Sequence, residues 1–236
     1  MNEIARPPVY LLAGGPGRRS GRDPVLELAI GSAGIERPSI AYVGAASGDD
    51  RGFFEAIAGY LRLSGAGRVE IAPMSSRRAK LERTAAILEA SDIILVSGGD
   101  VEEGMAVVEE RGMAPLLRDL HARGKPFLGI SAGSIMLARQ WVRWEDEGDD
   151  ATSSLFPCLG LAPVNCDTHG EGEGWGELRT LLRLCPDGAL GYGIPTGAAL
   201  CVHPGGSAEA LGTPVSRYAR AGGAVIRESD LEPAAR

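Results

Sequence analysis

The segment with the clearest chemical meaning is Gly129-Ile-Ser131-Ala-Gly133, which joins an apolar run to a helix-length segment. A serine at such a junction lies on a sharp turn where flanking side chains would collide, so glycine is needed two residues before and two after it. The turn brings the hydroxyl to the N-terminus of the next helix, where free N–H groups stabilise a developing oxyanion. The pattern predicts a nucleophilic Ser131. A glycine-rich turn with a capping serine is the alternative, because G-x-S-x-G is common by chance.

Paired glycines follow a second apolar run, in Val96-Ser-Gly98-Gly99-Asp100. Two adjacent glycines let a backbone N–H group approach a ligand closely, which is how the second half of an oxyanion hole is usually supplied. The segment is a poor phosphate cradle, because it has neither G-x-G-x-x-G nor the P-loop lysine. We expect Gly98 and Asp100 to line the substrate site, although an ordinary tight turn is the simpler interpretation of the glycine pair taken alone.

A nucleophilic serine needs a base, and the chain has three histidines. His169 ends the segment Val164-Asn-Cys-Asp-Thr-His169, at the carboxyl end of a predicted strand, where open α/β sheets collect their active sites. We therefore prefer His169 as the base, with a structural loop histidine as the alternative. His203 follows another predicted strand and could serve an esterase, whereas His121 is expected at an exposed helix position.

The elements that must position these residues alternate in type along the chain. Short runs rich in Val, Ile and Leu predict strands at Val9–Ala13, Ser39–Val43, Arg68–Ala72, Ile93–Val96 and Pro126–Ile130. The segments between them predict helices at Pro24–Ala33, Arg51–Ser64, Arg78–Ala90 and Val101–Ala122. Strands that are apolar nearly throughout are buried on both faces. The chain is therefore predicted to be an α/β protein, with a mostly parallel central sheet and helices on both faces.

The alternation stops after Gln140. The acidic stretch Trp141–Leu155 has no apolar periodicity and is interpreted as an excursion loop. Short strands interrupted by glycine then predict a small antiparallel C-terminal edge, at Ala198–Val202, Glu209–Leu211 and Ala224–Arg227. We expect a single domain over residues 1–236, with fraying at 1–8 and 228–236.

Composition excludes several classes of protein. The chain has 236 residues, with 24 Lys and Arg against 31 Asp and Glu, a net charge of −7 that opposes binding to nucleic acid or to anionic membranes. No apolar run is long enough for a secretory signal or a membrane span, so we expect a cytoplasmic protein. The cysteines match no metal or redox spacing and are expected to be buried thiols: Cys158, Cys166, Cys185 and Cys201.

Six segments together resemble the serine peptidases of the dipeptidase E and cyanophycinase family in order and rough spacing, over most of residues 9–205. They are Leu11–Gly15, Ile40–Ser47, Val96–Asp100, Gly129–Ser134, Asn165–His169 and Gly193–Ala199. The resemblance implies a flavodoxin-like fold of the class I glutamine amidotransferase type, with serine in place of the nucleophilic cysteine. It also implies that Ser131 is the nucleophile, that His169 is the base, and that the N–H groups of Gly99 and Ala132 form the oxyanion hole.

The chain departs from this family at two places. The position that carries an acid in the family is Thr196, in Gly193-Ile-Pro-Thr-Gly197. The family also has an acid in the loop after the nucleophile helix, and counting without gaps places Glu145 and Asp146 there as candidate orienting acids. A merely solvated acidic loop is the alternative.

The second departure is the run Gly170–Glu177, which stands where cyanophycinase-like sequences carry arginines and leaves Arg179 as the nearest basic residue. Together with Thr196, Arg179 is expected to contact substrate. The loops expected beside the site hold only Arg143 and Arg179 against eight carboxylates: Glu145, Asp146, Glu147, Asp149, Asp150, Glu171, Glu173 and Glu177. We therefore expect substrates with a free amine or a basic side chain to be preferred over those led by aspartate.

The sequence thus predicts a serine hydrolase that cleaves a small peptide or amide through an acyl-enzyme, without metal or cofactor. Two other functions stay open: a catalytically inactive binding protein on the same fold, which Thr196 favours, and an esterase that uses His203. A homodimer is one expectation for the assembly.

Overall fold

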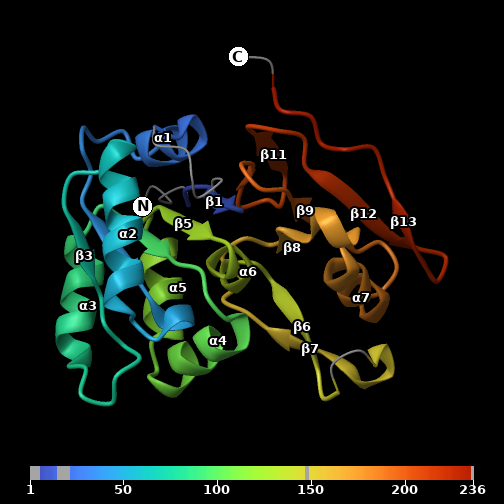
Figure 1. The fold of residues 1–236 in the computed structure, drawn as a ribbon, viewed down its shortest axis with the longest axis horizontal. Helices are drawn as coiled ribbons and strands as arrows, with labels where there is room; N and C mark the ends of the chain where they lie inside the picture. Colours follow the sequence, from blue (N-terminus) through green and yellow to red (C-terminus); the bar gives the residue numbers. More distant parts are fainter. Residues whose placement is uncertain (1–5, 15–21, 147–148, 235–236) are drawn as a thin grey trace, which may run out of the picture.

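The computed structural model describes residues 6–14, 22–146 and 149–234 (Figure 1). Its largest sheet has seven strands in the order β11-β10-β1-β5-β4-β2-β3. Five of them pair in parallel, as predicted: β1 (Val9–Leu12), β2 (Ile40–Val43), β3 (Val69–Ile71), β4 (Ile93–Val96) and β5 (Phe127–Ile130). The series β3-β2-β4-β5 follows the flavodoxin-like order, with β1 in the place of the fifth strand.

Helices cover both faces of this sheet, which confirms the predicted architecture (Figure 1). Alternate residues of each strand belong to opposite cores: Ile93 and Leu95 of β4 pack on one side, and Ile94 and Val96 on the other. The first core takes in α1 (Pro24–Gly31) and α2 (Arg51–Leu63). The second takes in α3 (Leu81–Ala90), α4 (Val101–Glu110), α5 (Ala114–Ala122) and α6 (Ala132–Leu137).

The C-terminal strands divide between two sheets, where a single antiparallel edge was predicted. The strands β10 (Ala199–Val202) and β11 (Ala208–Leu211) extend the central sheet antiparallel to β1. A second sheet has the order β13-β12-β9-β8 and is built from β8 (Asn165–Thr168), β9 (Leu190–Ile194), β12 (Ser216–Ala221) and β13 (Ala224–Arg227). The helix α7 (Gly176–Leu184) packs against this second sheet.

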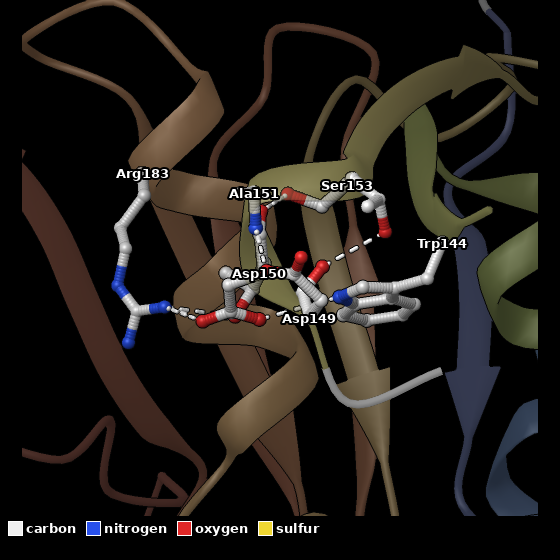
Figure 2. Close-up of polar contacts among 8 residues, drawn as sticks. Trp144, Asp149, Asp150, Ala151, Ser153 and Arg183 are labelled. Carbon is white, nitrogen blue, oxygen red and sulfur yellow. Dashed lines mark hydrogen bonds and ion pairs between the residues drawn. The ribbon is translucent and has the colours of Figure 1, made fainter. Parts of the chain in front are cut away.

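The stretch predicted as an excursion loop is instead an antiparallel hairpin of β6 (Gln140–Trp144) and β7 (Ser153–Pro157). Asp150 ties the end of the hairpin to α7 (Figure 2): its carboxylate accepts hydrogen bonds from Trp144 Nε1 at 3.2 Å and from Thr180 Oγ1 at 3.2 Å, and it pairs with Arg183. The strands were not predicted because the described acidic residues between them are exposed and the residues of β7 are at most half-buried, so the stretch has no apolar periodicity.

Three further expectations need correction. The predicted helix at Val101–Ala122 is two helices, because Gly112 adopts a left-handed φ of 65° and ends α4. His121 is buried, with Nε2 3.1 Å from the Pro7 carbonyl and its ring edge-on to Phe127. In the C-terminal tail, which was expected to fray, the backbone of Leu231 forms two hydrogen bonds with the backbone of Val215. Residues 1–5 and 235–236 lie outside the described part.

All four cysteines are buried, as predicted, and within the described part of the chain none of them forms a disulfide. Among the described residues, no helix is both long and apolar enough to cross a membrane.

Candidate active site

Ser131 occupies a strained turn between β5 and α6. Its φ of 54° and ψ of −125° are unfavourable for a residue with a side chain, by about 1–3 kcal/mol. A Cβ on Gly129 would lie 2.6 Å from Ser134 Cα, and one on Gly133 would lie 2.0 Å from the Val96 carbonyl oxygen. The glycines therefore have the steric role predicted for a nucleophile elbow. The Ser131 N–H donates to the Leu12 carbonyl at 2.9 Å, which fixes the turn to β1.

Two backbone N–H groups lie beside this serine. Gly99 follows β4 with a φ of 142°, and a Cβ there would lie 1.9 Å from the Ala46 carbonyl oxygen, so only glycine fits. A Cβ on Gly98 would lie 3.1 Å from Ser131 Cβ, which places this loop directly against the elbow. Ala132 begins α6, where an N–H has no partner within the helix. Among the described residues, neither the Gly99 nor the Ala132 N–H donates a hydrogen bond.

Ser131 and His169 line one cavity of about 330 Å³, together with Gly99 and Ala132. His169 follows β8 in a left-handed conformation, with a φ of 65°, and its N–H donates to the Ile194 carbonyl at 3.3 Å. The predicted serine and histidine thus come from different sheets to one cavity. Aromatic side chains of the hairpin, Trp141 and Trp144, complete its wall.

The imidazole of His169 contacts Thr196 rather than an acid. Nδ1 lies 3.1 Å from Thr196 Oγ1, and the Thr196 N–H donates to Glu171 Oε1 at 3.1 Å. Partial burial pushes the pKa of Glu171 upward, but hydrogen bonds from its own amide and from the amide and hydroxyl of Thr196, with the nearby His169, outweigh this effect and hold the pKa below its ordinary value. Thr196 was expected to bind substrate. Its described contacts are to His169 and Glu171.

The cavity is lined by the carboxylates of Asp100, Glu102, Asp167 and Glu177. Within the described residues, no lysine or arginine lines it. Burial, and then the charge of Glu177, raise the pKa of Asp167 to about 7 against hydrogen bonds from the Thr168 and Leu178 amides. Burial, and then Glu173, raise the pKa of Glu177. Asp167 was not among the predicted site residues, although its position two residues before His169 was a usable signal.

The predicted orienting acids lie elsewhere. Glu145 and Asp146 are exposed in the hairpin connection, where the Asp146 N–H donates to Thr152 Oγ1 at 3.1 Å, and neither lines the cavity. Trp144, which directly precedes Glu145, does line the cavity, but the side chains of Glu145 and Asp146 are exposed to solvent beyond the end of β6. Of the other acidic residues expected at the site, Glu177 lines the cavity, and Glu147 lies outside the described part.

Three other candidates have different surroundings from those expected. Arg179 is exposed on α7 and does not line the cavity. Asp100 lines the cavity, but its carboxylate also caps α4 by accepting the Glu103 N–H at 2.8 Å. His203 follows Val202, which pairs with Val9 at the start of β1, so it lies at the edge of the sheet opposite Ser131. There it bonds Glu209 at 2.9 Å, which removes the geometric basis of an esterase that uses His203.

Among the described residues, no group of three or more His, Cys, Asp or Glu side chains could hold a metal ion. The arrangement offers a hydroxyl on a strained turn, two N–H groups beside it that have no partner among the described residues, and an imidazole on the same cavity. These are the parts that acyl transfer requires.

Comparisons with known proteins find a family model, curated relatives and solved structures that resemble this chain. Residues 11–209 match the family model described as peptidase family S51. The chain is 29% identical over 147 residues to Peptidase E of Salmonella arizonae, an alignment that covers 57% of this chain and 63% of that protein. It is 35% identical over 120 residues to the imidazole glycerol phosphate synthase subunit HisH of Herpetosiphon aurantiacus, covering 48% of this chain and 50% of that one. Both alignments span less than two thirds of the relative.

The crystal structure of a peptidase from an acI-B1 Actinobacterium superposes with a TM-score of 0.74 at 17% identity, over 99% of this chain and 97% of that one. At that identity the likeness shows the fold alone. It covers the second sheet and the hairpin as well as the central sheet.

Proposed function

This chain belongs to peptidase family S51, and from that membership and the geometry of the elbow we propose that it is a serine peptidase cleaving a small peptide or amide through an acyl-enzyme. The observation that carries the proposal is the strained conformation of Ser131 on the cavity it shares with His169. A protein that only binds a ligand has no need to hold a serine in such a conformation.

In the proposed reaction, Ser131 Oγ attacks the scissile carbonyl carbon while His169 takes its proton. The negative charge that develops on the carbonyl oxygen is stabilised by the N–H groups of Gly99 and Ala132, which have no other partner among the described residues. The imidazolium then gives its proton to the leaving amine, and the C–N bond breaks to leave an ester on Ser131. Water, deprotonated by His169, hydrolyses that ester and restores the enzyme.

The cavity also bears on the substrate. Its volume of about 330 Å³ is at the lower end for small-ligand sites and suits a dipeptide-sized molecule. Because its charged lining residues are acidic, an ammonium or guanidinium group is favoured there and a substrate carboxylate is disfavoured. The preference for basic substrates therefore remains part of the proposal. Its basis moves from the hairpin carboxylates to those that line the cavity, among which Asp167 is fully charged only above its pKa of about 7.

The test is hydrolysis of a dipeptide library by the wild type and two serine variants. Ser131→Ala should abolish turnover and leave Tm nearly unchanged, because one half-buried hydroxyl is removed from a strained turn. Ser134→Ala is the matched control, since the buried Ser134 hydroxyl donates to the Leu12 carbonyl at 2.8 Å. Its loss should lower stability by about 1 kcal/mol while turnover persists. Turnover by Ser131→Ala, or a wild type that binds dipeptides and cleaves none, would refute the proposal.

A further inference from the structure

His169 needs a group that keeps Nδ1 protonated and turns Nε2 toward the serine. In a Ser-His-acid triad a carboxylate does this by accepting the Nδ1 proton, and it also stabilises the imidazolium. Here the group at Nδ1 is the Thr196 hydroxyl, 3.1 Å away. A hydroxyl can accept that proton, but it has no charge with which to stabilise the imidazolium. The missing charge must come from a neighbour of Thr196.

Glu171 is that neighbour. The Thr196 N–H donates to Glu171 Oε1 at 3.1 Å, which holds this carboxylate beside the residue whose hydroxyl contacts the imidazole. A hydroxyl proton turned toward the Glu171 carboxylate leaves the oxygen lone pairs of Thr196 for the Nδ1 proton. In that arrangement the imidazole donates to the hydroxyl, and the negative charge of Glu171 lies behind it.

The backbone holds the three residues together. The strands β8 and β9 pair Thr168 with Ile194, so His169 and the turn after β9 leave the same edge of the second sheet. That turn is closed by the Ala198 N–H on the Pro195 carbonyl at 2.9 Å, and the Gly197 N–H fastens it to the Gly14 carbonyl at 2.9 Å. Glu171 belongs to the short helical turn Gly170–Glu173 that directly follows His169. Thr196 and Glu171 are thus both held near the imidazole by short segments that directly follow β9 and His169.

We propose that Glu171 is the anion that orients His169 and stabilises its charged form, acting through the hydroxyl of Thr196. Both are positioning residues, and the role rests on the proposed function of Ser131 and His169. The other acids near the histidine are less suited to it. The Asp167 carboxylate is occupied by the Thr168 N–H at 2.6 Å on the cavity wall, and Glu145 and Asp146 lie in the hairpin connection.

The expected effect is moderate, because His169, Glu171 and Thr196 are all exposed and solvent screens the charge. A buried aspartate in direct contact with the histidine is worth about 10⁴ in kcat, so we expect Glu171→Gln to lower kcat by about 10- to 100-fold with little change in KM. Thr196→Val, which removes the hydroxyl at nearly constant shape, should cause a similar loss. Glu173→Gln is the matched control, since Glu173 lies on the same helical turn and has no hydrogen bond to Thr196.

Two readouts separate positioning from a merely structural role. The ring ¹⁵N shifts of His169 should report a proton on Nδ1 in the wild type and a mixture of tautomers in Glu171→Gln and Thr196→Val. Adding Thr196→Glu to Glu171→Gln should recover at least part of the lost kcat, because a carboxylate on residue 196 can meet Nδ1 directly. All variants are first matched for Tm.

The outcomes distinguish this inference from the proposed function. If Glu171→Gln has the kcat of Glu173→Gln, or loses kcat while its tautomer population stays that of the wild type, the role of Glu171 is wrong, and an inactive Ser131→Ala would leave the serine mechanism standing. Failure of Thr196→Glu to recover kcat likewise counts against the route through residue 196. Activity in Ser131→Ala would instead refute the proposed function itself.

Discussion

The buried carboxyl of Asp167 makes a prediction about stability that can be worked out from the structure. Asp167 is 5% exposed on the cavity wall, and burial together with the charge of Glu177 raises its pKa from 3.8 to about 7. The folded protein therefore binds this proton more tightly than the unfolded chain does. Stability from this group is retained at low pH and is lost as the pH rises from about 4 to about 7.

The difference between a pKa of about 7 and one of 3.8 corresponds to about 4 kcal/mol once the group is fully ionised. Between pH 5 and pH 8 the part of this loss that falls within the window is about 2–3 kcal/mol. Asp167→Asn removes the titration and keeps an oxygen that can accept the Thr168 N–H. Relative to the wild type, the free energy of unfolding of the variant should therefore increase by about 2–3 kcal/mol from pH 5 to pH 8.

The assay is urea unfolding of both proteins at pH 5, 6, 7 and 8. Asp146→Asn, at an exposed position of the hairpin connection, controls for the removal of one surface carboxylate. The quantity to follow is the difference in free energy of unfolding between wild type and Asp167→Asn. If it varies by less than about 0.5 kcal/mol across this pH range, or changes in the opposite direction, the pKa of Asp167 is not raised by burial.

Four other predictions follow from the site and its supports. Gly133→Ala places a Cβ 2.0 Å from the Val96 carbonyl oxygen and should cost about 1–3 kcal/mol of stability and most of kcat, whereas Gly59→Ala, in open space on α2, should stabilise by up to about 1 kcal/mol in the same unfolding assay. Lys-led dipeptides should exceed Asp-led ones in kcat/KM by at least about tenfold at low salt and less so near 1 M; a salt-independent preference for aspartate contradicts the acidic cavity. Asp150→Asn should weaken the attachment of the hairpin to α7, so hydrogen exchange of the β6 amides should become faster and KM should rise by a larger factor than kcat falls. His203→Ala should keep wild-type turnover, and a loss above tenfold would return His203 to the reaction.

The central sheet and the elbow were predictable because their signals are local. An apolar run that ends in Gly129-Ile-Ser131-Ala-Gly133 permits few conformations, and the structure shows the same steric need for both glycines that the sequence implies. The burial of both faces of β4 likewise follows from an unbroken run of aliphatic residues. Gly112 shows the limit of such signals, since one glycine inside an amphipathic stretch does not reveal whether the helix ends there.

The surroundings of His169 could not be predicted in the same way, because they depend on distances across the fold. Glu171 is separated from Thr196 by 25 positions in the chain, and only the pairing of β8 with β9 brings them together. A relay through a hydroxyl also leaves no acid at the expected position. The orienting acid was therefore predicted at Glu145 and Asp146, whose side chains are exposed in the hairpin connection and do not line the cavity.

The most direct test of the serine mechanism is brief exposure of the wild type, Ser131→Ala and His169→Ala to a fluorophosphonate probe, followed by peptide mapping of the labelled residue. We expect one adduct per chain on Ser131 in the wild type, none in Ser131→Ala, and labelling slower by about 100-fold or more in His169→Ala, since the activated hydroxyl depends on the base. A wild type that stays unlabelled, or an adduct on any other residue, would contradict it.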